Sequence, residues 1–192
     1  MDPYVYPNTN VLKNRRGLTT LEELAAFEGT ATSWRIEQLV RNPLAGNFDI
    51  PHLKRIHAHI FQDVYHWAGN FRTVNIARPG QFYFAFFEQI APMLTQLFQA
   101  LKSEKHLKGL DAPHFSQRAG YYLGELNATH PFRDGNGRTQ REFIRQLAQS
   151  NGFKAHWTRI TRDAMGAASK LSFQKADSSG LAALILTAIQ TN

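Results

Sequence analysis

The sequence contains no cysteine, which excludes a disulfide framework, zinc or iron–sulfur centres held by cysteine, and any thiol nucleophile. It has no apolar run near the roughly 18 residues that a membrane span needs, and its polar start lacks the basic-then-apolar order of a signal peptide. Internal repeats and low-complexity tracts are also absent. We therefore expect a chain without a membrane span that stays in the cytoplasm where it is made.

The composition favours one globular domain with a basic surface. The chain has 192 residues, of which 43% are hydrophobic, so a single domain over residues 1–192 can bury a sizeable core. Lys and Arg outnumber Asp and Glu by 22 to 15, and the net charge of +7 favours anionic partners. Direct nucleic-acid binding is one alternative. It is the weaker one, because the basic residues are spread along the chain and no common DNA- or RNA-binding signature is present.

Helical periodicity dominates the sequence and predicts a mainly α fold. Residues 1–17 lack this periodicity and are expected to form an N-terminal arm. Thr20 and Glu23 form a capping box that starts a helix running to about Val40. From Pro51 to Gly69, apolar residues recur every three or four positions and predict a second helix. Similar spacing predicts the remaining helices, over 90–101, 115–126, 138–150, 159–171 and 178–190.

Residues 71–86 carry the one clear β signal. FRTVNI alternates and is rich in β-branched residues, ARPGQ supplies turn residues, and FYFAF is aromatic. The segment is therefore predicted to be a β-hairpin, and the only β element of the chain.

The segment from His130 to Arg141, HPFRDGNGRTQR, is an unusually polar break between two predicted helices. Gly135 and Gly137 flank Asn136 at the entrance of the second helix, where backbone N–H groups can converge without obstruction by Cβ atoms. The positive end of the helix dipole adds to the potential there. This pattern predicts an anion cradle.

Charged side chains around the cradle indicate which class of anion it would bind. Arg138 and Arg141 are three residues apart on one helix and can share a polyphosphate. Asp134 would be repelled by phosphate unless a divalent cation lay between them, and a hard oxygen ligand suits Mg²⁺. His130 can exchange a proton near neutral pH, so it is the candidate general base.

These residues resemble the Fic (filamentation induced by cAMP) family. They match its motif, H-x-F-x-[D/E]-G-N-G-R-x-x-R, at all eight specified positions of twelve. The segment YYLGELNATHPF, the hairpin and the arm DPYVYP also resemble small bacterial Fic toxins, so the resemblance covers nearly the whole chain. It implies a Fic fold, a helical bundle with a β-hairpin flap at 71–86 and an active-site loop and helix start at 130–141.

The resemblance implies a protein adenylyltransferase, which transfers AMP from ATP to a Ser, Thr or Tyr hydroxyl of a target protein and releases pyrophosphate. His130 would deprotonate that hydroxyl, and Asp134 would hold Mg²⁺ between the α- and β-phosphates. Phe132 would be a buried plug that fixes the loop. The ATP phosphates would be held by the rest of the motif: Gly135, Asn136 (α-phosphate), Gly137, Arg138 (β-phosphate) and Arg141 (γ-phosphate).

Two further features follow from the same resemblance. In the Doc branch, which phosphorylates its target, a lysine replaces the second motif glycine and the nucleotide binds in reverse, so Gly137 favours AMP transfer. The flap is expected to pair with the main chain of the target so that its hydroxyl meets His130. Target docking is assigned to the residues after the turn, with core packing as the alternative for the aromatic ones: Gln81, Phe82, Tyr83 and Phe84.

Many Fic proteins are restrained by a helix with the sequence [S/T]-x-x-x-E-[G/N], whose glutamate pairs with the second motif arginine, here Arg141. Only Glu28 is followed by Gly or Asn, and Leu24 stands where the Ser or Thr belongs. No glutamate follows Glu142. We therefore expect a separate antitoxin that carries the inhibitory helix.

The resemblance leaves the target open. For a small bacterial toxin it implies a type II topoisomerase such as DNA gyrase. If the chain is part of a secreted effector that enters a host cell, it implies a host small GTPase. A degenerate scaffold without activity is a further alternative, which the complete motif disfavours. Histidines outside the motif are expected to be ordinary surface or cap residues, including His52, His57, His59 and His66.

Overall fold

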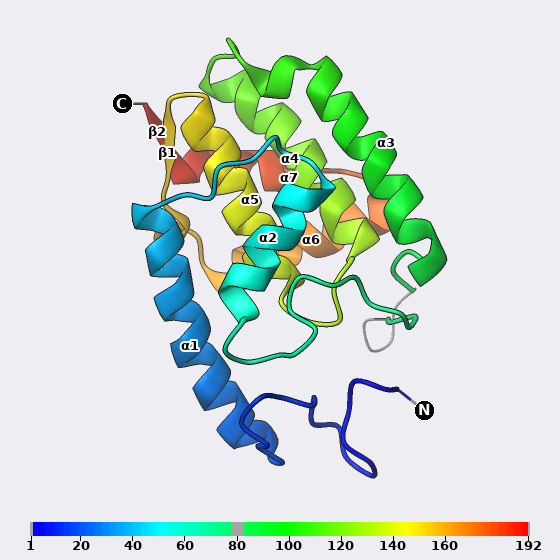
Figure 1. The fold of residues 1–192 in the computed structure, drawn as a ribbon. Coiled ribbons are helices and arrows are strands. Elements are labelled where there is room, and N and C mark those ends of the chain that lie inside the picture. Colours follow the sequence, from blue (N-terminus) through cyan, green and yellow to red (C-terminus); the bar gives the residue numbers. More distant parts are fainter. Residues whose placement is uncertain (1, 78–82, 192) are drawn as a thin grey trace.

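A computed structural model describes residues 2–77 and 83–191, and the expected mainly α fold is confirmed (Figure 1). Three short 3₁₀ turns, at 87–89, 105–107 and 157–159, lie between the main elements. The helices are α1 Leu21–Arg41, α2 Ile50–Phe61, α3 Ile90–Ser103, α4 Ala112–Thr129, α5 Asn136–Ser150, α6 Arg162–Lys175 and α7 Ser179–Ala188. The strands are β1 Phe153–Ala155 and β2 Ile189–Thr191.

Helices α4 and α5 form the centre of the fold. Helix α4 packs against α3, α5, α6 and α7, while α2 packs against α1 and α5 (Figure 1). The inward face predicted for α5 is confirmed, because Phe143, Ile144 and Leu147 are fully buried. The loop that joins α4 to α5 is therefore held between two core helices.

Helix α1 begins as the sequence predicts. The Thr20 hydroxyl oxygen accepts a hydrogen bond from the Glu23 N–H at 3.3 Å, and the Thr20 hydroxyl donates to the Glu23 carboxylate at 2.7 Å. Thr20 thus caps α1 as predicted, whereas the Glu23 carboxylate binds the Thr20 hydroxyl and not a backbone N–H group, so the capping box is only half formed.

The second predicted helix is too long, because α2 ends at Phe61 rather than near Gly69. The Phe61 carbonyl accepts from the N–H groups of both Val64 and Tyr65, at 2.9 and 3.0 Å, which closes a turn. The Val64 carbonyl then accepts from the Arg15 N–H at 2.8 Å instead of continuing a helix. The apolar spacing persists past the helix end because the turn residues are also buried.

The prediction of a single β element is also wrong. Strands β1 and β2 pair antiparallel, with Phe153 opposite Thr191 and Ala155 opposite Ile189. The last predicted helix, 178–190, therefore ends at Ala188, whose carbonyl accepts from the His156 N–H at 2.9 Å. Strands of three residues are too short for a period-2 pattern to appear in the sequence.

The β-hairpin predicted at 71–86 is only partly confirmed, because its described residues form no regular strand and pair through one isolated bridge. Ala77 and Tyr83 form an antiparallel bridge, and the Phe84 N–H donates to the Ile76 carbonyl at 3.2 Å. Residues 78–82, which include the predicted docking residues Gln81 and Phe82, lie outside the described residues.

The N-terminal arm contacts the loop between α4 and α5. The Arg133 guanidinium donates to the Asp2 carboxylate at 2.7 and 2.9 Å, and the Tyr4 ring meets the Trp67 ring edge-on with centroids 5.6 Å apart. Within the described ranges, no helix combines the length and the apolar character needed to cross a membrane.

Candidate functional site

The sequence His130–Arg141 forms a sharp connection between α4 and α5. His130 ends α4 in the left-handed region at φ 47°, and its N–H donates to the Leu126 carbonyl at 3.0 Å. Gly135 precedes α5 at φ 78°, also in the left-handed region, which favours glycine. These two positive φ values turn the chain so that His130 and the start of α5 line the same cavity.

The N-terminus of α5 lacks a side-chain cap. Its N-cap residue is Gly135, where a Ser, Thr, Asp or Asn would ordinarily accept hydrogen bonds from the first turn. A Cβ at Gly135 would lie 2.2 Å from Cζ of Phe61, so no larger residue fits without movement. The first N–H groups of α5 have no partner within the helix and are available to an anion.

The Asn136 side chain fixes the loop from within. Its Oδ1 accepts from the Phe132 N–H at 2.9 Å, and its Nδ2 donates to the Phe132 carbonyl at 2.8 Å. Phe132 is buried, as expected for a plug. Because the buried Asn136 side chain holds the loop, the group of Asn136 that can meet a phosphate is its backbone N–H.

A second support for the loop is His57, which was expected to be a surface or cap histidine but is fully buried. Its ring stacks on Phe132 with centroids 3.8 Å apart. Nδ1 accepts from the Gly69 N–H at 2.8 Å, so Nε2 carries the proton and donates to the Asp134 carbonyl at 3.1 Å. Burial lowers the pKa of His57 to about 3, and the ring is neutral at pH 7. His52 is likewise buried, whereas His59 is partly buried and His66 exposed.

Acid is expected to destabilise the protein through His57. An unfolded histidine titrates near 6.5, so the unfolded state binds more protons below that pH, and stability is lost as the pH falls from 6.5 toward 3. At pH 5 the loss from His57 alone should be about 2 kcal/mol relative to pH 7.5. Urea unfolding of wild type and His57→Gln at both pH values measures it. If the free energy of unfolding fell equally with pH in the two proteins, His57 would not be the cause of the loss. His52, whose pKa is also lowered by burial, contributes equally to both proteins.

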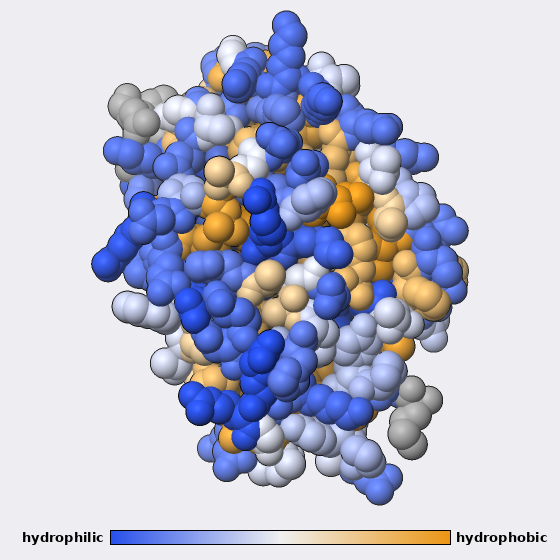
Figure 2. Space-filling view, viewed as in Figure 1, coloured by the Kyte–Doolittle hydropathy of each residue, from blue (hydrophilic) through white to orange (hydrophobic). Residues whose placement is uncertain are grey.

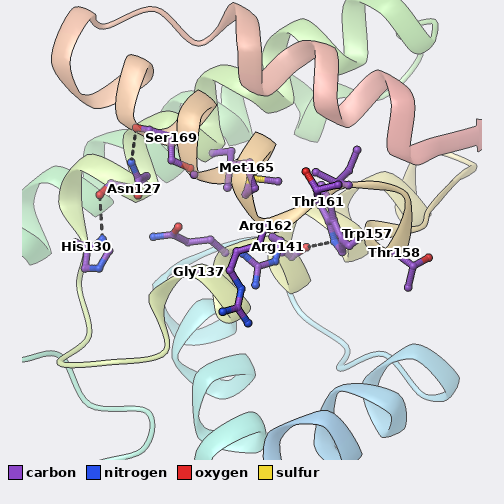
Figure 3. A pocket seen from close by; sticks show the side chains of 14 residues that line it. Asn127, His130, Gly137, Arg141, Trp157, Thr158, Thr161, Arg162, Met165 and Ser169 are labelled. Atoms are coloured by element: carbon purple, nitrogen blue, oxygen red, sulfur yellow. Dashed lines mark hydrogen bonds between the residues drawn. The ribbon is translucent and has the colours of Figure 1, made fainter. Parts of the chain in front are cut away.

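The His130 ring is held on two sides. Nδ1 lies 3.2 Å from the Asn127 carbonyl, which can only accept, so Nδ1 carries the proton and Nε2 has the lone pair in the neutral ring (Figure 3). The Phe84 ring stacks on His130 with centroids 3.8 Å apart and an interplanar angle of 13°. Phe84 is only 6% exposed, which places its side chain against His130 rather than against a docked target. Tyr83, by contrast, is exposed.

Arg72 joins the base of the hairpin to the loop. Its buried guanidinium donates to the carbonyls of His130 at 2.9 Å, Val74 at 2.7 Å and Ala85 at 2.5 Å, and its pKa is lowered to about 10 by burial. Its backbone N–H also donates to the Pro131 carbonyl at 3.0 Å. Sequence reasoning did not single out Arg72, because a lone arginine in an alternating segment resembles a solvent-facing residue.

Positive charge accumulates at the start of α5. Burial lowers the pKa of Arg141, and the positive charges of Arg138 and Arg162 nearby lower it further. Among the described residues, no carboxylate lies within 4 Å of the Arg141 guanidinium. Arg162, the first residue of α6, was not predicted, because it lies outside the motif. The site therefore contains concentrated positive charge that an anion would neutralise.

Arg138 differs from Arg141 because it has carboxylate partners. Its Nη2 lies 2.5 Å from Oε1 of Glu28 on α1 and 3.6 Å from Oδ1 of Asp134. Partial burial, and then the negative charge of Glu28, raise the pKa of Asp134 above its usual range. The Asp134 side chain remains 43% exposed, so one of its oxygens is accessible to a cation.

Two cavities meet at these residues. One of about 410 Å³ is lined by His130, residues 133–138, Arg141 and the hairpin residues Ile76, Ala77 and Phe84. The other, of about 530 Å³, shares His130, Gly137 and Arg141 and extends to α6 (Figure 3). Its wall includes Leu123, Trp157 and Met165, and the Trp157 indole N–H donates to the Arg141 carbonyl at 3.0 Å. A charged cavity thus adjoins a more apolar one. The face of the molecule shown in Figure 2 is mostly hydrophilic, with apolar side chains gathered in patches.

Seven of the eight specified motif residues line one cavity, and the eighth, Phe132, is buried beneath the loop. The seven are His130, Asp134, Gly135, Asn136, Gly137, Arg138 and Arg141. The contacts that fix them come largely from residues that the sequence did not single out for this purpose: Glu28, His57, Phe61 and Arg72.

The comparisons with known sequences agree with the motif. The model of the Fic/DOC family matches residues 47–148. Protein adenylyltransferase VbhT of Bartonella schoenbuchensis is 47% identical over 90% of this chain, which spans only 36% of VbhT. The probable protein adenylyltransferase Fic of Escherichia coli is 36% identical, with 88% of this chain and 83% of that protein covered.

The comparisons with solved structures agree as well. BepC of Bartonella tribocorum, solved with bound AMPPNP, superposes with a TM-score of 0.94 at 28% identity, covering 98% of this chain and 97% of that one. The N-terminal Fic domain of a VirB-translocated Bep effector from Bartonella quintana, solved with bound ADP, also has a TM-score of 0.94, at 29% identity and 98% and 95% coverage. The matched motif, family model and fold together establish that the chain belongs to the Fic/DOC family.

Proposed function

We propose that this protein is an adenylyltransferase that transfers AMP from ATP to a Ser, Thr or Tyr hydroxyl of a target protein and releases pyrophosphate. The observation that supports this best is one cavity lined by the His130 ring, the uncapped start of α5 and the guanidinium groups of Arg138 and Arg141. A base and a polyphosphate site therefore adjoin one another. VbhT and the Escherichia coli relative carry the same activity in their names.

His130 acts as the general base. With Nδ1–H directed to the Asn127 carbonyl, Nε2 has the lone pair that takes the proton of the target hydroxyl. The hydroxyl oxygen then forms a bond to the α-phosphorus as the bond from that phosphorus to the bridging oxygen of pyrophosphate breaks. Phe84 and Asn127 keep the imidazole in place for this transfer.

The start of α5 binds the phosphates. Its first backbone N–H groups, at Asn136 and Gly137, have no partner within the helix and meet the α-phosphate, while Arg138 and Arg141 take the β- and γ-phosphates. The cavity of about 530 Å³ toward α6, with its apolar wall, takes the nucleoside.

Asp134 is the residue that fits a Mg²⁺ ion. Mg²⁺ in nucleotide sites keeps several waters and is held by one or two carboxylates together with substrate phosphates. Asp134 lines the phosphate cavity with a partly exposed carboxylate, which meets this requirement. When bound, the ion would neutralise charge on the departing pyrophosphate.

Gly137 supports AMP transfer rather than phosphoryl transfer. A Cβ there would lie 3.2 Å from Nη1 of Arg141, so a side chain at this position would compete with that guanidinium for space. A lysine, as in the Doc branch, would therefore require the Arg141 guanidinium to shift.

The hairpin at 71–86 acts as the flap that docks the target chain. Its base is tied to the His130 carbonyl through Arg72, so a segment paired with the flap would present its hydroxyl near the base. The exposed ring of Tyr83 is the described side chain suited to touch the target.

A separate antitoxin controls the activity. Arg141 has no carboxylate partner among the described residues, and Glu28 pairs with Arg138 instead. An inhibitory helix with the sequence [S/T]-x-x-x-E-[G/N] from another chain would supply the missing glutamate. The purified chain alone should then be active. If the purified chain transfers no AMP and becomes active only when Glu28 is changed, a separate inhibitor is contradicted.

The target belongs to one of two classes. A toxin would act in the bacterial cytoplasm on a type II topoisomerase such as DNA gyrase. An effector would act on a small GTPase after transfer into a host cell. Proteins similar to this chain include VirB-translocated Bartonella effectors and the probable protein adenylyltransferase Fic of Escherichia coli.

Mass spectrometry of two lysates tests the proposal. The purified chain is incubated with ATP and Mg²⁺ in a bacterial and in a eukaryotic lysate, and peptides are searched for the mass of an added AMP. Modified Ser, Thr or Tyr residues should appear with wild type and not with His130→Ala. The lysate in which they appear separates the two target classes, whereas modification in neither lysate would count against the activity.

A further inference from the structure

We infer that Glu28 is a positioning residue that holds the Arg138 guanidinium at the phosphate cavity and thereby sets the affinity for the nucleotide. The inference rests on the proposed function, because it assigns Arg138 to a nucleotide phosphate. It concerns a residue on α1, more than a hundred positions from the motif along the chain.

Residues outside α5 contact the Arg138 guanidinium on several sides. Nη2 donates to Glu28 at 2.5 Å, and Nη1 donates to the Thr32 hydroxyl at 3.1 Å. The guanidinium carbon lies 4.7 Å from the centroid of the Phe61 ring, a cation–π contact. A guanidinium has five N–H donors, so these two hydrogen bonds leave donors for an anion.

Glu28 is itself fixed. Its side chain is 14% exposed, and its second oxygen accepts a short hydrogen bond from the buried Tyr65 hydroxyl. Glu28 and Thr32 lie one turn apart on α1, and Tyr65 follows α2, so two separate parts of the fold converge on Arg138. An arrangement with so many buried polar partners leaves the guanidinium little rotational freedom.

The location of Glu28 distinguishes a positioning role from an inhibitory one. Arg138 lines the phosphate cavity together with His130 and Arg141, but Glu28 lines neither this cavity nor the adjoining one. A carboxylate that excluded a phosphate would have to face the space that the phosphate enters. Glu28 instead contacts the guanidinium from outside the cavity.

The partner of Glu28 also differs from that of the family's inhibitory glutamate. That glutamate pairs with the second motif arginine, which is Arg141 here, whereas Glu28 pairs with the first, Arg138. Removing the Glu28 charge should therefore loosen Arg138 and weaken nucleotide binding, not release a brake.

Calorimetric titration with AMPPNP measures this directly. Glu28→Gln keeps the size of the side chain and an acceptor for Tyr65 but removes the charge. We expect the Kd for AMPPNP to rise about tenfold, since a charge-assisted hydrogen bond is replaced by a neutral one. Glu37→Gln is the matched control, because Glu37 lies on the same helix and its ion-pair partner within the described ranges is Arg41 on the surface. It should leave the Kd unchanged.

A double-mutant cycle shows whether Glu28 acts through Arg138. Added to Arg138→Gln, the Glu28→Gln change should alter the Kd by less than twofold, because the group that it positions is gone. A full tenfold effect in that background would overturn the inference. The inference would also be overturned if Glu28→Gln bound AMPPNP more tightly or transferred AMP faster than wild type. A lower unfolding midpoint of Glu28→Gln without any change in its Kd would overturn it as well.

The cycle also separates this inference from the proposed function. If wild type binds AMPPNP and the cycle behaves as expected while no protein receives AMP, the positioning role stands and the reaction is wrong. If wild type does not bind AMPPNP, both are wrong.

Discussion

Replacing His130 by alanine should lower the rate of AMP transfer by about 10²- to 10⁴-fold, the usual contribution of a positioned general base. The reason is that Nε2 of His130 has the lone pair that accepts the proton of the target hydroxyl, while Nδ1 is committed to the Asn127 carbonyl. The binding of AMPPNP should change little, because the phosphates bind to α5. Initial rates at saturating ATP, measured with the target that mass spectrometry identifies, give the effect on turnover.

His114→Ala is the matched control for that experiment. His114 is also on α4, but its side chain is 69% exposed and, among the described residues, bonds to Asp111 at the start of the helix. Its loss should leave the rate within about twofold of wild type, as for an ordinary surface substitution. If His130→Ala kept more than a tenth of the wild-type rate, His130 would not be the general base.

Gly135→Ala should destabilise the fold by about 3 kcal/mol or more. A residue with a Cβ at φ 78° costs about 1–2 kcal/mol, and overlap with the Phe61 ring, 2.2 Å from the added Cβ, adds about 1–3 kcal/mol. AMP transfer should be lost as well, because any shift of residue 135 moves the N–H groups at the start of α5. Urea unfolding gives the free-energy change.

Gly109→Ala separates the two causes. Gly109 has nearly the same backbone angle, φ 84°, but nothing lies within 4 Å of an added Cβ. It should therefore cost only the about 1–2 kcal/mol of backbone strain and leave activity intact. The excess cost of Gly135→Ala is then the Phe61 contribution. Equal costs for the two variants would mean that Phe61 does not restrict position 135.

Elements that carry their own local signals could be predicted from the sequence. The cap residue Thr20 fixes the start of α1, and the apolar spacing of Phe143, Ile144 and Leu147 fixes the inward face of α5. The end of α2 could not be predicted, because the Val64 carbonyl that would continue the helix instead accepts from Arg15, almost fifty residues away. Strand β2 exists only because β1 pairs with it.

In the site too, local sequence signals could be read, whereas contacts made by tertiary packing could not. Residues of the motif are adjacent in the sequence, so their spacing alone placed His130, Asp134 and the arginines together. Glu28 and Arg72 act through contacts that tertiary packing creates, and each is a single charged residue in a segment with no distinctive pattern. His57 was expected to be a surface or cap residue because the spacing of the histidines outside the motif does not form a helical metal-ligand pair, yet two hydrogen bonds satisfy its ring in the core.

Two radiolabelled forms of ATP test AMP transfer most directly. The purified chain is incubated with Mg²⁺ and its target and with ATP labelled either at the α- or at the γ-phosphorus, and the protein is then separated from nucleotide. Attack on the α-phosphorus transfers AMP, so the α label should remain on the target and the γ label should leave with pyrophosphate. Retention of the γ label would instead show phosphoryl transfer, and retention of neither label would contradict transfer from ATP to the target.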